Sequence, residues 1–482
     1  ADALNRIQFE MLTNREALDP DAELRIHITV DEENKTITVA DTGIGMTREE
    51  MITNLGTIAQ SGAAAFVKRL QEARAAQEAQ GKEGERVPAL EVIGQFGVGF
   101  YSAFMVAEQV RVVSRSWRPD AEAVEWTSDG SATYRIGPAE KSDRGTEVIV
   151  ELKDDAVEFA HRWRIEQIVR RHSDFVAFPI TVSSTGAEQD ADQARVVNRQ
   201  KPLWRQQPRQ VESDAYDEFY KHLTMDQEKP LLSSHLVVDV PVDIRSVLYI
   251  PAHRQRSALD PRADYGLRLY ARGVLIQANN KDLLPGYLRF VEGVVESEDL
   301  PLNVSRETVQ RNLAARRIQK ALLGKLIRDL VELSEQDADR YNALWAEFGP
   351  FIKEGVATDL ANKDDLVPLL RFHSSQAQEL VSLPEYVNGM HEAQTDIYYL
   401  LGEDLETIAR SPHLDYFRAR GIQVLTLVDP VDSFLVTALA EYDGKPLRNI
   451  DDASLELPQV EPEEQAAQES PDAPSVPDDQ FG

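Results

Sequence analysis

The sequence predicts an α+β fold, in which an antiparallel sheet covered on one face by helices is followed by a second domain of α/β type. An alternating pair of strand-like runs near 24–40 is the first sign of the sheet. Four more strand-like runs follow, at 110–114, 124–127, 133–136 and 146–152. A helical pattern spans 159–172, and a last strand is expected at 180–182. In the second half, runs at 397–401, 412–420, 422–428 and 432–440 alternate between strand and helix patterns, which indicates β-α-β units with parallel strands.

Composition restricts the class of protein. A chain of 482 residues can bury several cores, and we expect two to four domains. Zero cysteines exclude disulfides and thiolate metal sites. The net charge of −30 disfavours partners such as nucleic acid or an anionic membrane. No apolar run reaches the roughly 18 residues of a membrane span, so we expect a cytoplasmic location.

The first glycine cluster is DTGIGM at 41–46, directly after a strand-like run at 36–40. Asp41 would therefore lie at a strand end with its carboxylate, which only accepts hydrogen bonds, facing a cleft. Such a group suits an adenine amino group, and Gly43 and Gly45 would let a base approach closely. Taken alone, the Asp-Thr-Gly tripeptide is more typical of an ordinary turn.

The second glycine cluster is IGQFGVGFYS at 93–102. Gly94, Gly97 and Gly99 precede an expected helix at 100–106, whose first N–H groups could bind phosphate oxygens. The spacing matches neither a Walker loop nor a dinucleotide fingerprint. A turn that permits tight packing is the alternative.

A third segment, RGTEVIV at 144–150, opens a strand with Gly-Thr. The three segments in this order resemble the nucleotide site shared by gyrases, histidine kinases, mismatch-repair ATPases and the 90-kDa heat-shock chaperones. NLGTIAQSG at 54–62 and PLNVSRETVQRN at 301–312 resemble the heat-shock chaperones in particular. The resemblance runs from residue 1 to about 445, and the short linker favours the bacterial type.

The resemblance implies an ATP/ADP site with Mg²⁺. It implies that Asp41 and Thr146 hold the adenine and that Asn54 and the second glycine cluster serve the phosphates. The implied cofactor-binding residues are Asp41, Gly45, Met46, Asn54, Gly97, Val98, Gly99, Phe100 and Thr146. The nine histidines show no paired metal spacing, so we expect no dedicated protein metal site.

Arg306 and Gln310 are the catalytic residues that the resemblance implies. A guanidinium is permanently charged and fork-shaped, which suits a γ-phosphate presented across a domain boundary. Gln310 would lie one helical turn further along the same face. The alternative for an isolated Ser-Arg-Glu is a salt bridge at a helix start.

The resemblance, together with the composition of the linker and the tail, implies the following domain organisation. A nucleotide-binding domain spans 1–183, with a lid at about 56–97, and a linker spans 184–196. A middle domain for client binding and γ-phosphate sensing spans 197–450. The tail at 451–482 contains ten acids and five prolines, so we expect it to be disordered.

The resemblance also predicts that the chain is truncated at both ends. Relatives carry a water-activating glutamate and a magnesium-holding asparagine before Ala1, and only Asp2 of that signature is present. They also carry a C-terminal dimerisation domain beyond the tail, so we expect a family homodimer but a monomeric chain. Gln60 replaces a basic residue that is usual in the family and could approach phosphate.

The function that the resemblance implies is an ATP-dependent chaperone for non-native client proteins, in which ATP hydrolysis drives lid and domain closure. The alternative is a hydrolysis-deficient holdase that binds nucleotide. A phosphotransfer kinase would need a phosphoacceptor helix upstream of the site. Cochaperones are possible further partners. Trp204, Phe219 and Tyr220 could contact clients, but we expect them to be buried.

Overall fold

A computed structural model describes residues 1–14, 16–56, 94, 99–185, 195–254, 265–300 and 313–457. The chain divides into two compact units. The first unit comprises Ala1–Ile250, Asp260–Leu284 and Val291–Leu323, and the second comprises Pro251–Leu259, Pro285–Phe290 and Gly324–Gly482. The predicted linker at 184–196 falls inside the first unit, so the boundary between a nucleotide-binding and a middle domain stays a prediction.

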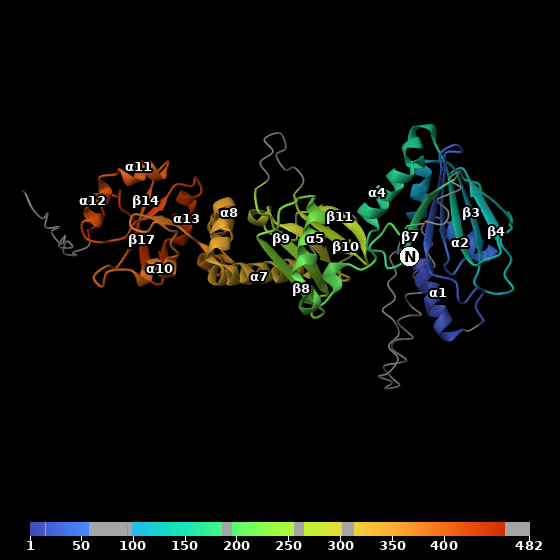
Figure 1. Ribbon diagram of the computed structural model, residues 1–482, viewed down its shortest axis with the longest axis horizontal. Helices are drawn as coiled ribbons and strands as arrows, with labels where there is room; N and C mark the ends of the chain where they lie inside the picture. The colour runs from blue at the N-terminus through green and yellow to red at the C-terminus, as the bar shows by residue number, and fades with distance from the viewer. Residues whose placement is uncertain are drawn as a thin grey trace, which may run out of the picture. The chain divides into compact units, whose positions relative to one another are not determined.

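A seven-stranded sheet forms the N-terminal part of the first unit (Figure 1). Its strand order is β5-β4-β3-β6-β2-β1-β7. The strands are β1 (Ile26–Asp31), β2 (Thr36–Asp41), β3 (Ala107–Arg115), β4 (Val124–Ser128), β5 (Arg135–Pro138), β6 (Gly145–Leu152) and β7 (Ile180–Ser184).

The pairing within this sheet differs from the prediction at one edge. Strands β1 to β6 pair antiparallel as expected, but β7 pairs parallel to β1, with Ile28 opposite Val182. A parallel neighbour needs a crossover connection, and the chain between β6 and β7 contains the helix α4 (Arg162–His172). The sheet is therefore mixed.

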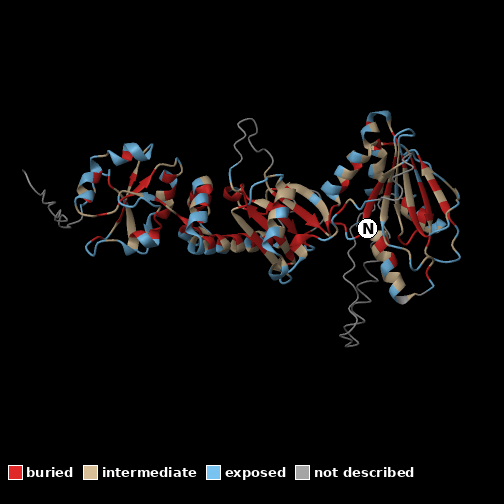
Figure 2. Ribbon diagram, in the orientation of Figure 1, coloured by how far each residue is buried: buried red, intermediate tan, exposed pale blue. Residues whose placement is uncertain are grey.

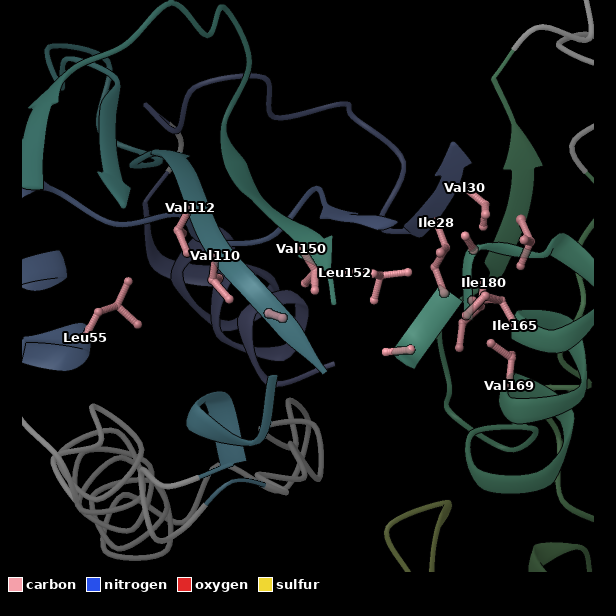
Figure 3. Close-up of a cluster of buried hydrophobic side chains, with 14 of the residues drawn as sticks. Ile28, Val30, Leu55, Val110, Val112, Val150, Leu152, Ile165, Val169 and Ile180 are labelled. Atoms are coloured by element: carbon pink, nitrogen blue, oxygen red, sulfur yellow. The ribbon is translucent and has the colours of Figure 1, made fainter. Parts of the chain in front are cut away.

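Helices pack on one face of this sheet, as the fold class predicts. The core joins buried residues of α1 (Asp2–Thr13), α2 (Arg48–Leu55) and α4 to the strands, as burial in Figure 2 and the side chains in Figure 3 illustrate. In Figure 3, Ile165 and Val169 of α4 lie near Ile180 of β7. The opposite face carries charged residues such as Arg111, which pairs with Glu125.

The structure refines two helical expectations in this region. The segment after the second glycine cluster is helical as expected, and it forms the 3₁₀ helix η1 (Gly99–Met105). The single helix expected over 159–172 is divided into η2 (Asp154–Ala160) and α4, because His161 has extended backbone angles. Trp163 of α4 is 59% exposed, because Ile165 and Val169 occupy the buried face of this helix. Leu12 of α1 is also exposed.

A five-stranded sheet forms the rest of the first unit, in the order β11-β10-β12-β9-β8. The strands are β8 (Leu232–Val238), β9 (Ile244–Ile250), β10 (Leu267–Ala271), β11 (Val274–Asn280) and β12 (Glu292–Glu296). The short helices η3 (Leu203–Arg205) and η4 (Pro208–Gln210) and the helix α5 (Ser213–Thr224) precede it. Trp204, Phe219 and Tyr220 are buried in its core, as expected.

The second unit is largely helical at first and ends in a five-stranded sheet. Its helical elements, counting α7, which begins in the first unit, are α7 (Leu313–Gln336), α8 (Ala338–Thr358), α9 (Lys363–Leu366), α10 (Leu383–Asn388), α11 (Leu405–Ala409), α12 (His413–Arg418), α13 (Asp432–Leu439), η5 (Gly286–Leu288) and η6 (Val367–Leu369). Its strands are β13 (His373–Ser374), β14 (Ile397–Leu401), β15 (Leu425–Leu427), β16 (Glu441–Tyr442) and β17 (Lys445–Asn449). Strand β14 pairs parallel to both β15 and β17, which confirms the predicted β-α-β units.

A buried lysine joins α8 to the segment that begins α13. The Nζ atom of Lys353 lies 2.7 Å from Oδ2 of Asp429 and 2.8 Å from Oδ1 of Asp432. Lys353 and Asp432 are both buried. Burial raises the pKa of Asp432, although the charge of Lys353 acts in the opposite direction.

Several predicted segments lie wholly or partly outside the described residues: nearly all of the lid at about 56–97, the residues from 301 to 312, and 458–482. The first residues of the predicted tail are described, and they form a turn in which Asp452 accepts a hydrogen bond from the Ser454 N–H at 2.8 Å. None of the helices in the described part of the chain combines the length and apolar character that a membrane crossing requires.

Candidate functional site

The candidate site is built on three neighbouring strands. Asp41 ends β2 and lies opposite Thr146 of β6, and Thr146 lies opposite Ser114 of β3. Directly opposed residues of neighbouring strands share a face. By the same register, this is the face of Val110 and Val112, which contributes to the helix-covered core. Three polar side chains therefore lie between the sheet and its helical layer.

The helical layer leaves part of the sheet open beside these residues. Val39 lies two residues before Asp41 on the same face, yet it remains 37% exposed. Its neighbour across the strands, Val148, is half-buried. An exposed apolar surface on the core side of a sheet is a suitable floor for the flat face of an aromatic base.

One oxygen of the Asp41 carboxylate is already bonded. Its Oδ1 accepts the Gly43 main-chain N–H at 2.8 Å. Among the residues that the structure describes, no donor is bonded to Oδ2. Burial raises the pKa of Asp41, and the hydrogen bond from Gly43 opposes this shift. The open oxygen can accept a hydrogen bond from a ligand amino group.

Ser114 links the two sides of the site. Its hydroxyl donates to the Gly145 carbonyl at 3.2 Å and accepts the Met46 N–H at 2.9 Å. It also lies 2.8 Å from the Thr146 hydroxyl. The first glycine cluster is therefore tied to the Gly-Thr segment through one buried side chain.

Two glycines are required by the close approach of main chains. Gly45 has φ +62°, and a Cβ atom there would lie 1.8 Å from the Arg115 carbonyl oxygen. Gly145 has φ +118°, and a Cβ atom would lie 2.0 Å from the Asp41 carbonyl oxygen. Both positions exclude a side chain, so glycine at these positions lets the loop and strand close around the site.

Asn54 lies in the last turn of α2. A capping box begins this helix: Thr47 accepts the Glu50 N–H, and Glu50 accepts the Thr47 N–H. Leu55, the next residue, is buried in the core, and its carbonyl accepts the Tyr101 hydroxyl at 3.0 Å. Asn54 is half-buried. The structure records no contact between Asn54 and Asp41 among the described residues.

Only part of the second glycine cluster can be located. Gly99 begins η1, and the Phe100 ring packs against Trp126 with centroids 5.7 Å apart. The side chain of Phe100 is therefore held in the core, and the main chain of this residue is the part that remains available to bind a phosphate. The Gly94 N–H donates to Asp2 Oδ2 at 2.6 Å and so connects the cluster to α1. Gly97 and Val98 lie outside the described residues.

The two predicted catalytic residues, Arg306 and Gln310, and the unusual Gln60 also lie outside the described residues. The structure therefore brings together Asp41, Gly45, Met46 and Thr146. It gives Asn54, Gly99 and Phe100 a place on α2 and η1. The other predicted site residues keep the status of predictions.

Two residues of the site were not identified from the sequence. Ser114 is a polar residue on the face of β3 that otherwise carries Val110 and Val112, and this break in the alternating pattern is a signal. Arg144 precedes the Gly-Thr pair, and its buried guanidinium donates to the carbonyls of Thr42 and Gly43. No sequence pattern indicates that an arginine will turn inward toward main-chain carbonyls.

The chemistry of the site favours a neutral or cationic hydrogen-bond donor above an apolar floor. No group of three or more acidic or histidine side chains suitable for a metal ion occurs in the described part of the chain. A metal held chiefly by ligand phosphates, as Mg²⁺ commonly is, would need no such group.

Two family models match the chain. The Hsp90 protein family matches residues 184–475. The family of histidine kinase-, DNA gyrase B- and HSP90-like ATPases matches residues 9–133, which include Asp41, Gly45 and Asn54. The two matches lie in the order that the sequence analysis predicts.

Curated relatives match nearly the whole chain. Chaperone protein HtpG of Chlorobaculum tepidum is 41% identical over 471 residues, which cover 96% of this chain and 72% of the relative. Chaperone protein HtpG of Geobacter sulfurreducens is 40% identical over 488 residues, which cover 98% and 73%. The protein of the same name from Geobacter metallireducens is 39% identical, with the same coverage.

Proposed function

Because the chain belongs to the Hsp90 protein family, we propose that it is an ATP-dependent molecular chaperone. The observation that carries this proposal is the arrangement of Asp41 and Thr146 on adjacent strands beside the exposed Val39. The Asp41 carboxylate and the Thr146 hydroxyl can bind the edge of an adenine base, and the apolar surface at Val39 can contact the face of the base. The names of the relatives support the chaperone activity.

At the adenine end, Asp41 accepts a hydrogen bond from the exocyclic amino group. Its fixed contact with Gly43 sets the direction of the remaining oxygen. Thr146 serves the same edge of the base through its hydroxyl, directly or through water. Gly45 and Met46 lie beside the base in this arrangement. The Met46 N–H is bonded to the side chain of Ser114, which belongs to the same hydrogen-bond network as Thr146.

At the phosphate end, Asn54 and the main chain of residues 97–100 bind the phosphates of ATP or ADP together with Mg²⁺. The N–H groups at the start of η1 suit phosphate oxygens, because the first N–H groups of a helical segment have no partner within it. Mg²⁺ would supply charge neutralisation between the phosphates. Arg306 and Gln310 contact the γ-phosphate, which ADP lacks.

The domain proposal follows the family matches. The match to the Hsp90 family begins at residue 184, at the start of the linker proposed at 184–196. The lid at about 56–97 closes over bound ATP, and the middle domain at 197–450 binds non-native clients. ATP binding and hydrolysis drive this closure, in the cytoplasm and with possible cochaperones.

The proposal is tested by comparing ADP with a non-hydrolysable ATP analogue in calorimetric titrations with Mg²⁺. Arg306→Ala should weaken the analogue about tenfold or more, because it removes a charged hydrogen bond to the γ-phosphate. The affinity for ADP should stay nearly unchanged. Arg316→Ala, on the exposed face of α7, is the matched control and should leave both affinities unchanged.

Two further measurements separate the chaperone from the alternative of a nucleotide-binding holdase. The ATP-driven chaperone should suppress the aggregation of a heat-denatured enzyme to an extent that depends on nucleotide, and its thermal melting temperature should rise when nucleotide is added. A holdase would suppress aggregation equally with and without nucleotide. Failure of the unmodified chain to bind either nucleotide would contradict the proposed function.

A further inference from the structure

Arg144 is a buried cation beside the candidate site. The residue is only 2% exposed, and its guanidinium donates to main-chain carbonyls. One nitrogen, Nη1, bonds the Thr42 carbonyl and lies 3.3 Å from the Gly43 carbonyl. The other, Nη2, lies 3.2 Å from the Asp19 carbonyl and 3.5 Å from that of Ala22. The guanidinium therefore bridges two separate loops.

The 18–25 segment and the 41–45 loop are held together by further bonds. Asp19 Oδ2 accepts the Arg144 main-chain N–H at 3.1 Å. The Thr42 hydroxyl donates to the Glu23 carbonyl at 2.7 Å and accepts the Arg25 N–H at 3.0 Å. These contacts fix the course of the main chain directly after Asp41.

We propose that Arg144 is a positioning residue of the nucleotide site, which fixes the 41–45 loop so that the Asp41 carboxylate faces the adenine edge. This inference rests on the proposed function. A guanidinium carries five donors in a rigid fork, so it can satisfy carbonyls of both loops at once. A loop conformation that withdrew the Thr42 and Gly43 carbonyls would leave a buried cation with fewer partners, which is costly.

Arg144 also acts on the charge of Asp41. Burial raises the pKa of Asp41, and the charged groups that face it, which are the amino group of Ala1, Lys141 and Arg144, lower it. Removal of Arg144 should therefore raise the pKa of Asp41 further. Since the carboxylate accepts the adenine amino group only when ionised, ADP binding should then be lost at a higher pH as the pH falls.

The test measures ADP affinity from pH 5 to pH 8 by calorimetry for four proteins: the unmodified chain, Arg144→Met, Arg144→Lys and Arg371→Met. Arg371 is the matched control, because its guanidinium also bonds main-chain carbonyls, those of Pro368 and Leu370, but it belongs to the second unit. Thermal melts of all four proteins report any general loss of stability.

Arg144→Met should weaken ADP binding about ten- to hundredfold, in line with the loss of buried hydrogen bonds from a charged donor. Its affinity should also fall off at a higher pH than that of the unmodified chain. Arg144→Lys keeps the charge but not the fork, so it should lose part of the affinity and keep the unmodified pH profile. Arg371→Met should show the unmodified ADP affinity and pH profile, even if its melting temperature falls.

The proposal is overturned if Arg144→Met folds and binds ADP with the affinity and pH profile of the unmodified chain. If Arg144→Met fails to fold, Arg144→Lys provides the test. An ADP affinity of Arg144→Lys equal to that of the unmodified chain then overturns the proposal. Equal effects of Arg144→Met and Arg371→Met on affinity and pH profile would also overturn it, because they would indicate a general role in stability. If the unmodified chain binds no ADP, the proposed function fails first, and this inference fails with it.

Discussion

Glu296 illustrates how single buried charges organise the first unit. This carboxylate is 1% exposed. It accepts the Trp204 indole N–H at 2.6 Å, the Gly273 main-chain N–H at 2.7 Å and two Arg205 donors at 2.7 and 2.8 Å. Burial alone would raise the pKa of Glu296, but the hydrogen bonds and charge of Arg205 outweigh it and lower the pKa. The segment that contains Trp204 and Arg205 is thereby fixed to β12.

Arg205→Met should lower the free energy of unfolding of the first unit by about 3–5 kcal/mol, because it leaves a buried carboxylate without its charged partner. Urea unfolding measures this change. Arg111→Met is the control, since it removes an exposed pair with Glu125 and should cost less than about 1 kcal/mol. Equal costs for the two variants would contradict the role assigned to Glu296.

The pH dependence of stability provides a second readout on the same two proteins. A carboxylate whose folded pKa is lowered stabilises the fold above its unfolded pKa, near 4.5 here, and this contribution is lost as the pH falls through the folded pKa. The unmodified chain should therefore lose more unfolding free energy than Arg205→Met when both are acidified below about pH 4.5.

At the scale of elements, α2 begins with a capping box directly after the first glycine cluster, and its last turn carries Asn54, the residue proposed to bind phosphate. Its capping box involves Thr47 and Glu50, directly after Met46, and Met51 and Leu55 anchor its inner face in the core. The helix α10 has the same device, with Ser382 and Glu385, in the second unit. The chain therefore provides a matched pair of capping boxes, one next to the site and one remote from it.

Thr47→Ala should destabilise its helix start by about 0.5–2 kcal/mol, and Ser382→Ala should do the same at α10. Only Thr47→Ala should also weaken ADP binding, because fraying at Thr47 releases the main chain of Met46 and shifts Asn54. Thermal melts and ADP titrations on both variants measure the two effects. Loss of ADP affinity in Ser382→Ala, or none in Thr47→Ala, would argue against a role for the α2 start in the site.

The elements also show what the sequence could predict. The strand ends and the glycine clusters could be recognised from local sequence patterns, so Asp41 and Thr146 could be assigned to strands in advance. Their direct pairing could not, because register depends on contacts between distant segments. The parallel pairing of β7 was missed for the same reason. The inward turn of Arg144 depends on the course of the 18–25 loop, 119 or more residues earlier in the sequence.

At the scale of the whole molecule, the acidic charge is general. Ten of the acids lie in the tail from Asp451, and the rest of the chain still has a net charge of −20. A ligand such as ATP is itself anionic, so general electrostatic attraction cannot bring it to this protein. Specific contacts at the base and phosphates must provide the affinity, and Asp41 is the contact that can be tested most cleanly.

The most direct test of the central claim compares ADP with inosine diphosphate on the unmodified chain and on Asp41→Asn. Adenine presents an amino donor where hypoxanthine presents a carbonyl oxygen, so the unmodified chain should prefer ADP by about a hundredfold or more. In Asp41→Asn the amide can donate as well as accept, and the preference should fall to within about tenfold. Asp31→Asn, at an exposed turn, should keep the full preference. Equal binding of both nucleotides by the unmodified chain, or an undiminished preference in Asp41→Asn, would contradict an adenine site at Asp41.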